Sequence, residues 1–409
     1  MKVIEYPARK DWPEIIKRPA MDTRELSGSV AEILADVRAN GDDALRKLSC
    51  KFDGIELGEL LVGEDEFVAA DAEVSQDLKD ALAVAKANIE KFHSVIATDP
   101  EKIETTTGVV CWKRFLPIEK VGLYIPAGSA PLFSTVLMLA IPAKLAGCRE
   151  IVMCSPPDSN GRVNSATLYA ARLCGVTKVF KIGGAQAIAA MAYGTETVPR
   201  VYKIFGPGNQ YVTEAKLQTM REGIAIDMPA GPSEVAVLAD ETCVPAFVAA
   251  DLLSQAEHGP DSQVILVTNS QAVIDDVLDE VECQVYVLPR KETARAALAN
   301  SKAILVRTTD EGVDLLNEYA AEHLILAVRD AETIANSITN AGAIFLGNYS
   351  CESAGDYSSG TNHTLPTNGA ARAFSGVSVA SFMKSVTYQQ LSEDGIRNLG
   401  PVIETMAAA

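Results

Sequence analysis

Basic residues are scarce relative to acidic ones in this sequence. It contains 36 Lys and Arg against 54 Asp and Glu, which gives a formal net charge of −18. Nucleic acids and anionic membranes are bound through basic surfaces, so this balance argues against either as a main partner. A small anionic cofactor is not excluded, because backbone amides can bind phosphate groups.

Long apolar runs and paired cysteines are also missing. No apolar run reaches about 18 residues without charge or proline, so we expect no membrane-spanning helix. The eight cysteines form no C-x-x-C pair, and the opening MKVIEYPARKDWPEI has no apolar signal core. These features are typical of a cytoplasmic protein with reduced thiols.

Length and apolar content indicate more than one folded domain. The chain has 409 residues, of which 48% are hydrophobic and 22% charged, as in soluble globular proteins. One hydrophobic core rarely serves so many residues, so two or more domains are expected. Roughly the first 100 residues have helical periodicity. A break at Asn40-Gly41 divides the segment 29–54 into two helices, and 77–95 is a further amphipathic helix.

From Val121 onward, short apolar strands alternate with helical segments. This alternation predicts βαβ units and therefore mainly parallel sheets. One compact α/β domain is expected from Val121 to about Ser233, and a second α/β series follows as far as Gly347. After a polar, glycine-rich stretch, about 30 C-terminal residues predict a strand and a terminal helix.

Gln255 and His258 are one turn apart just before a Gly-Pro helix stop. Positions i and i+3 share one face of a helix, so an amide oxygen and an imidazole could meet at one metal ion. Taken alone, the pair is better explained by a histidine that caps the negative end of the helix.

Glu322 and His323 are adjacent, at the junction between a helix and an apolar strand. An acid beside an imidazole supplies two proton-transfer groups of different pKa, although a helix-end histidine beside a solvated acid gives the same pattern. Ligands in open α/β sheets usually gather at the carboxyl ends of strands, whereas this pair precedes its strand.

Asp356 and His363 lie in the polar loop GDYSSGTNHTLPT. An aspartate is a hard oxygen ligand, and the histidine offers another imidazole; an ordinary loop is the alternative. Three of the four histidines thus fall in polar segments at element edges, while His93 lies within a plain amphipathic helix. Together they suggest a metal or proton-transfer site built from the second α/β series.

Two glycine-containing loops in the first α/β domain precede helices, IGGAQAIAA and FGPGNQYVTEAK. Free amides at a helix start can receive phosphate oxygens. Neither loop is a G-x-G-x-x-G or Walker A motif, so close packing of a helix on a sheet explains them equally well.

Seven segments, taken in order, resemble the histidinol dehydrogenase family. They are GLYIPAGSAPLFSTVLM, GGAQAIAAMAYGT, FGPGNQYVTEAK, DMPAGPSEV, SQAEHGPDSQ, EHL and GDYSSGTNHTLPT. The resemblance implies zinc- and NAD-dependent oxidation of L-histidinol to L-histidine through L-histidinaldehyde, with reduction of two NAD, as the last step of histidine biosynthesis. It implies a homodimer with shared active sites.

The resemblance also assigns roles to residues. Zinc would be bound by Gln255, His258 and Asp356. His323 would be the general base, and Glu322 would activate the water that attacks the aldehyde. Substrate would contact the ligand residues together with Ser233, His323 and His363, and NAD would contact Tyr124, Gln186 and Asn209.

The fold implied by the resemblance is α/β, with two incomplete Rossmann-like domains whose sheets are mainly parallel. Helical N-terminal and extended C-terminal segments would serve dimerisation. The expected division is an N-terminal segment 1–20; a first α/β domain with the zinc and catalytic residues, 21–120 with 234–365; an NAD-binding domain, 121–233; and a C-terminal tail with dimer contacts, 366–409.

The sequence departs from the family pattern at its C-terminal end. In the family, a short tail carries a glutamate that binds substrate and a histidine that completes the partner's zinc site; GPVIETMAAA stops where that tail would begin. A truncated chain and a non-catalytic or impaired relative are both alternatives. A cysteine-dependent aldehyde dehydrogenase is the other enzyme class considered, with Cys351 as its candidate nucleophile.

Overall fold

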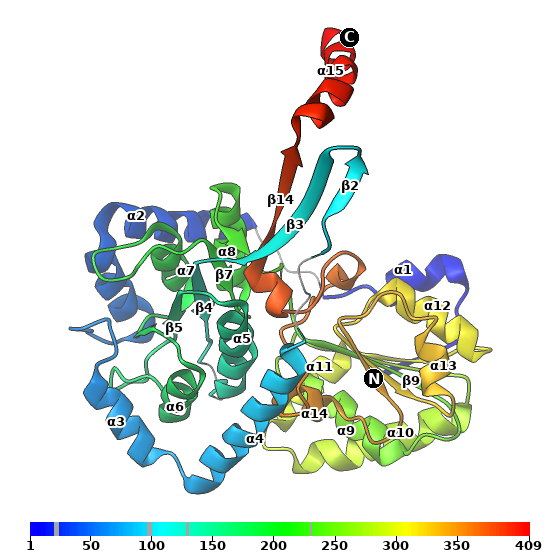
Figure 1. Ribbon diagram of the computed structural model, residues 1–409. Coiled ribbons are helices and arrows are strands. Elements are labelled where there is room, and N and C mark those ends of the chain that lie inside the picture. The colour runs from blue at the N-terminus through cyan, green and yellow to red at the C-terminus, as the bar shows by residue number, and fades with distance from the viewer. Residues whose placement is uncertain (20–23, 96–99, 128–130, 230) are drawn as a thin grey trace.

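Two parallel sheets organise the chain in the computed structural model, which describes residues 1–19, 24–95, 100–127, 131–229 and 231–409. Each sheet is covered by helices and forms one lobe of the molecule, and a third, antiparallel sheet projects from between the lobes (Figure 1). Two of the segments that resemble the family lie partly outside the described residues, namely GLYIPAGSAPLFSTVLM (122–138) and DMPAGPSEV (227–235). The expected domain boundary at residue 20 lies outside them as well.

The first lobe contains a five-stranded sheet with the order β6-β5-β4-β7-β8, in which all pairings are parallel. Numbered along the chain, this order is 3-2-1-4-5, which is the order of a Rossmann sheet without its sixth strand. Its strands are β4 (Lys120–Tyr124), β5 (Glu150–Cys154), β6 (Lys178–Phe180), β7 (Lys203–Phe205) and β8 (Ala225–Ile226). The helices between them are α5 (Phe133–Ala146), α6 (Ser165–Cys174), α7 (Gly184–Tyr193) and α8 (Gln210–Arg221).

The second lobe repeats this order in a six-stranded sheet, β1-β11-β10-β9-β12-β13, which is again parallel throughout. The additional edge strand is β1 from the N-terminus. The strands are β1 (Lys2–Glu5), β9 (Glu234–Ala239), β10 (Gln263–Thr268), β11 (Lys302–Leu305), β12 (His323–Ala327) and β13 (Ala343–Leu346). The helices are α1 (Trp12–Ile15), α9 (Pro245–Ala256), α10 (Gln271–Val287), α11 (Lys291–Ala299), α12 (Thr309–Tyr319), α13 (Ala331–Ala335) and α14 (Glu352–Tyr357). The expectation of two incomplete Rossmann-like domains with mainly parallel sheets is confirmed.

The N-terminal helices are α2 (Arg24–Asp53), α3 (Glu64–Glu73) and α4 (Gln76–His93). The break expected at Asn40-Gly41 is present, because Gly41 has a φ of 51° inside α2, a backbone conformation that favours glycine. The three helices pack on the five-stranded lobe, with Leu34 and Leu45 buried in its core. The division expected from the family resemblance placed residues 21–120 with 234–365, in the other lobe. An apolar stripe on a helix indicates that this face is buried, but it does not specify which sheet covers the face.

The projecting sheet has the antiparallel order β14-β3-β2 and carries the last helix at its end (Figure 1). It consists of β2 (Ile103–Thr106), β3 (Val109–Pro117) and β14 (Met383–Leu391), followed by α15 (Glu393–Ala408). The expected C-terminal strand and helix are thus both present. Short 3₁₀ helices occur at Arg9–Asp11, Ala370–Arg372 and Val379–Phe382. Among the described residues, no helix combines the length and the apolar character that crossing a bilayer requires.

Candidate active site

A cleft of about 990 Å³ lies between the two lobes and brings together opposite edges of the two sheets. From the first lobe, it is lined by Gly206 and Asn209, which follow β7 at the carboxyl edge of the five-stranded sheet. From the second lobe, it is lined by Ser233 and Glu322, which precede β9 and β12 at the amino edge. The first edge is the usual ligand-binding edge of an α/β sheet, and the second is not.

The backbone of Glu234 positions both members of the Glu322–His323 pair. β9 and β12 are neighbours in the sheet, with His323 paired to Val235, so Glu322 and His323 both lie close to Glu234. The N–H of Glu234 donates to Oε2 of Glu322 at 2.8 Å, and its carbonyl oxygen lies 3.3 Å from Nδ1 of His323. Both side chains are buried, so their orientation is fixed by the strand register.

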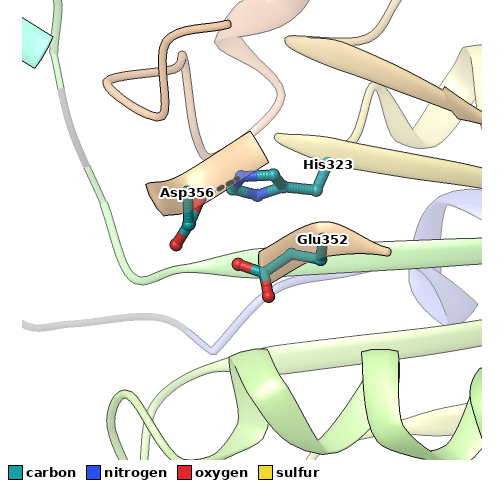
Figure 2. A group of neighbouring side chains, drawn as sticks. All are labelled: His323, Glu352 and Asp356. Atoms are coloured by element: carbon teal, nitrogen blue, oxygen red, sulfur yellow. Dashed lines mark ion pairs between the residues drawn. The ribbon is translucent and has the colours of Figure 1, made fainter. Parts of the chain in front are cut away.

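His323 lies between two carboxylates. Its Nδ1 is 3.7 Å from Oε2 of Glu322, and its Nε2 is 3.3 Å from Oδ1 of Asp356. Figure 2 shows the ring directed at Asp356, with the carboxylate of Glu352 beside both groups. Burial alone would lower the pKa of His323, but the Glu322 and Asp356 carboxylates outweigh it and raise this pKa well above its ordinary value.

Two polar side chains on α9 and two on α14 lie where these helices pack together. On α9, Asp251 and Gln255 are four residues apart, and on α14, Glu352 and Asp356 have the same spacing. Oδ1 of Asp251 accepts from the N–H of Glu352 at 3.0 Å, and Nε2 of Gln255 donates to Oε1 of Glu352 at 2.5 Å. Two hydrogen bonds, from successive turns of α9, thus join this helix to Glu352 at the start of α14.

Several buried polar atoms of this region have no hydrogen-bond partner. They include Oε1 of Gln255, Oδ1 of Asp356 and Nε2 of His323, of which the last two lie 3.3 Å apart. Unpaired buried oxygens are costly, and a bound cation would satisfy them. Amide and carboxylate oxygens with a nearby imidazole suit a divalent transition metal, so the residues present fit a zinc ion.

His258 and Ser233 are neighbours in the lining of the cleft. The Oγ of Ser233 lies 3.5 Å from Nδ1 of His258, and both residues line the cleft. His258 follows the C-terminal end of α9, two residues after Ala256. It has an exposed face, but desolvation of its ring in the cleft lowers its pKa, against the opposing effects of Asp356 and Glu322. A neutral imidazole is the form that binds a metal.

His363 connects the polar loop to both lobes. Its Nδ1 lies 2.8 Å from the carbonyl oxygen of Asp356, and its Nε2 lies 3.1 Å from the Oγ1 of Thr135 on α5. The carbonyl can only accept, so Nδ1 donates and Nε2 accepts from the threonine hydroxyl. The ring also lines the cleft.

The three residues expected to contact NAD differ in whether they line the cleft. Asn209 lines the cleft, where its Oδ1 caps α8 by accepting from the N–H groups of Tyr211 and Val212. Tyr124 and Gln186 are buried and do not line it. The Tyr124 hydroxyl accepts from the N–H of Gly184 at 3.0 Å, which fixes the first turn of α7, and burial raises the pKa of Tyr124 to about 12.

Sequence reasoning missed two residues of this site, Glu234 and Glu352. Glu352 forms, with His323 and Asp356, a group whose potential ligand atoms all lie within 4.8 Å of one another. Its spacing of four residues from Asp356 was the available signal, because that spacing places two side chains on one helix face. Glu234 acts through its backbone, which no side-chain pattern reveals.

The two-lobed architecture defines the class of protein. The structure matches the crystal structure of an acetylating aldehyde dehydrogenase from Geobacillus thermoglucosidasius with a TM-score of 0.50 and 14% identity, over 93% of this chain and 94% of that chain. At that identity the likeness shows the fold alone, which is a two-domain α/β fold.

The chain belongs to the histidinol dehydrogenase family, whose sequence profile matches residues 16–409. It is 57% identical to the histidinol dehydrogenase of Bacteroides fragilis (strain YCH46) over 408 residues, which cover 100% of this chain and 95% of that protein. It is 54% identical over 395 residues to that of Xanthomonas euvesicatoria pv. vesicatoria, with 96% and 91% of the two chains covered. The crystal structure of histidinol dehydrogenase from Elizabethkingia anophelis matches with a TM-score of 0.97 and 52% identity, over 100% of this chain and 94% of that one. The protein is therefore an oxidoreductase of this family.

Proposed function

We propose that this protein oxidises L-histidinol to L-histidine through L-histidinaldehyde, with zinc bound and with reduction of two NAD, as the last step of histidine biosynthesis. The main support is a set of buried, unpaired polar atoms beside an acid–imidazole pair, of which Glu322, together with His258, lines the cleft. The names of relatives at 53–57% identity support the substrate.

The proposed zinc ligands are Gln255, His258 and Asp356. These residues would also contact the substrate. Zinc, when bound, would orient the imidazole and amine of histidinol, since both groups are good ligands. Ser233 beside His258, and His363 beside Asp356, line the same cleft and would contact the substrate. This arrangement would hold the substrate's alcohol carbon near His323.

His323 is the proposed general base. Its Nδ1 hydrogen is held by the Glu234 carbonyl, so in the neutral ring Nε2 is the nitrogen that can take the alcohol proton. NAD, when bound, accepts the hydride from the same carbon. Asn209 would contact NAD in the cleft, whereas Tyr124 and Gln186 line no part of it in this conformation and would contact NAD only if they became accessible.

Glu322 is the proposed base for the second oxidation. The N–H of Glu234 holds one of its oxygens, Oε2, while the carboxylate lines the cleft. Its other oxygen would take a proton from the water that adds to the aldehyde, forming the hydrate from which the second hydride leaves. Neither step needs a thiol.

We also propose a homodimer with shared active sites and a cytoplasmic location. The projecting β14 and α15 support the dimer, because α15 carries apolar side chains that are exposed in the single chain, among them Val402, Ile403 and Met406. All eight cysteines are free, as is usual in the cytoplasm.

The proposal is tested by incubating the purified full chain with zinc, NAD and L-histidinol. We expect histidinol-dependent NADH, two NADH per histidine formed, loss of activity on chelation and recovery with zinc. NADH formation without histidine, or activity that survives complete metal removal, would overturn it. Activity abolished both by a thiol-blocking reagent and by Cys351→Ala would identify the alternative thiol-dependent chemistry at Cys351.

A further inference from the structure

We propose that Glu352 is a positioning residue that fixes the Gln255 amide so that its oxygen, rather than its nitrogen, faces the metal. The inference rests on the proposed zinc site. It assigns Glu352 no bond to the ion. It concerns the orientation of one ligand, which decides whether that ligand can bind a cation at all.

An amide side chain has two ends of nearly the same shape and opposite hydrogen-bonding character. The oxygen can bind a cation, but the NH₂ group can only donate. Gln255 is 1% exposed, so water cannot choose between the two orientations. A neighbouring side chain has to do so.

Glu352 fixes the orientation of the Gln255 amide through a single hydrogen bond. Its Oε1 accepts from Nε2 of Gln255 at 2.5 Å. Rotating the amide by half a turn would turn its NH₂ group away from Glu352 and place the Gln255 oxygen there, so this hydrogen bond would be lost. In the orientation observed, Oε1 of Gln255 is buried and makes no hydrogen bond, so its lone pairs can bind a cation.

Glu352 is itself held in place by two further contacts. Its N–H donates to Oδ1 of Asp251, one turn before Gln255 on α9, and the hydroxyl of Ser353 donates to its Oε2 at 3.3 Å. It is 2% exposed. Residues that hold metal ligands in this way commonly change metal affinity by about 10–100-fold when they are replaced.

A competing explanation is that Glu352 binds the ion directly, since it lies within 4.8 Å of His323 and Asp356 (Figure 2). The two explanations differ for Glu352→Gln. Glutamine keeps a carbonyl oxygen that can accept from Gln255, and its NH₂ can donate to Asp356. It loses the negative charge that makes a carboxylate a strong ligand.

The first experiment measures zinc affinity by chelator competition on the full chain and on two variants. Glu352→Met fills the space without an acceptor, and we expect it to weaken zinc binding about 10–100-fold. Glu352→Gln should stay within about twofold of the unaltered chain, as expected when the contact that matters is retained. Equal weakening in both variants would overturn the proposal in favour of a direct ligand.

The second experiment removes the asymmetry of the ligand. In Gln255→Glu, both ends of residue 255 are oxygens, so no orienting partner is needed. Adding Glu352→Met to that background should not weaken zinc binding. If it weakens binding there as much as in the unaltered chain, Glu352 does not act by orienting an amide, and the proposal fails.

The outcomes separate this inference from the proposed function. If the unaltered chain binds no zinc, the proposed metal site fails and the inference fails with it. If it binds zinc and Glu352→Met binds equally well, only the inference fails. Thermal unfolding of each metal-free variant shows whether it is folded, and an unfolded Glu352→Met leaves the decision to Glu352→Gln and to the Gln255→Glu pair, which then overturn or support the proposal by the same criteria.

Discussion

The imidazole Nδ1 of His323 lies 3.3 Å from the backbone carbonyl oxygen of Glu234. A carbonyl oxygen only accepts, so the ring nitrogen on this side carries the hydrogen and the other nitrogen, Nε2, is the one able to take a proton. A main-chain group on a neighbouring strand therefore sets the tautomer of the proposed base. Side-chain substitutions at Glu234 leave this contact in place.

His323→Ala should abolish turnover while zinc remains bound. Loss of a general base typically costs about 10²–10⁴-fold in rate, and His323 is outside the proposed ligand set. The measurements are histidinol-dependent NADH formation and zinc content of the same sample. His93→Gln is a suitable control, because His93 is buried in α4 and does not line the cleft. A near-normal rate in His323→Ala would refute the assignment.

Glu322→Gln should spare the first oxidation more than the second. The amide oxygen of glutamine can still accept from the N–H of Glu234, but it cannot take a proton from water. The rates are compared with histidinol and with histidinaldehyde supplied separately. Glu322→Ala should show the same order of effects with an added loss of stability of about 1–3 kcal/mol, because it leaves a buried N–H unpaired. Equal loss of both oxidations in Glu322→Gln would count against the assigned role.

The elements themselves could be predicted from sequence patterns, and their pairing could not. The break at Gly41, the alternation from Val121 and the C-terminal strand and helix all follow from local periodicity and turn residues. The contact between Gln255 and Glu352 joins positions 97 residues apart. It depends on α14 docking against α9, which no local pattern specifies.

The location of the cleft was predictable only in part. The usual rule points to the carboxyl ends of strands, and the loop after β7 obeys it. The amino ends of β9 and β12 face the same cleft only because the two lobes meet with opposite edges of their sheets. That relationship is a property of lobe packing, so the pattern around Glu322 could not reveal it.

Arg18→Met should destabilise the second lobe strongly. Arg18 donates to both carboxylate oxygens of Glu234 at 2.6 and 2.7 Å, and the Glu234 side chain is 3% exposed. Removing the arginine leaves a buried carboxylate without its partner, which typically costs about 3–5 kcal/mol. Denaturant unfolding measures the loss in the free energy of unfolding.

The double variant provides the control for Arg18. Glu234→Gln keeps an acceptor for the N–H of Asn368 but removes the charge that Arg18 neutralises. Adding Arg18→Met to Glu234→Gln should therefore cost clearly less than Arg18→Met alone. Equal costs in the two backgrounds would mean that the destabilisation comes from lost packing on the Tyr319 ring, 4.1 Å from the guanidinium carbon, rather than from the ion pair.

The stability of the metal-free chain should fall as pH rises from about 4 to 6, through the titration of Asp251. Burial raises the pKa of Asp251 from 3.8 to about 6, against the opposing effect of the hydrogen bond from the Glu352 N–H. In this range the folded state holds the proton that the unfolded state has lost, so the folded state loses its advantage with each step in pH. A shift of about two pKa units corresponds to roughly 3 kcal/mol.

Asp251→Asn isolates this effect, because asparagine cannot ionise yet keeps an oxygen that accepts from the N–H of Glu352. Unfolding is measured in urea across the pH range, with a chelator present because zinc binding is itself pH-dependent. Asp251→Asn should match the unaltered chain below about pH 4 and exceed its stability by up to roughly 3 kcal/mol above about pH 6. Asp276→Asn, at an exposed position on α10, should show no such pH-dependent difference. A constant gap between Asp251→Asn and the unaltered chain at every pH would mean that Asp251 acts through its hydrogen bond alone and that burial imposes no penalty on its charge.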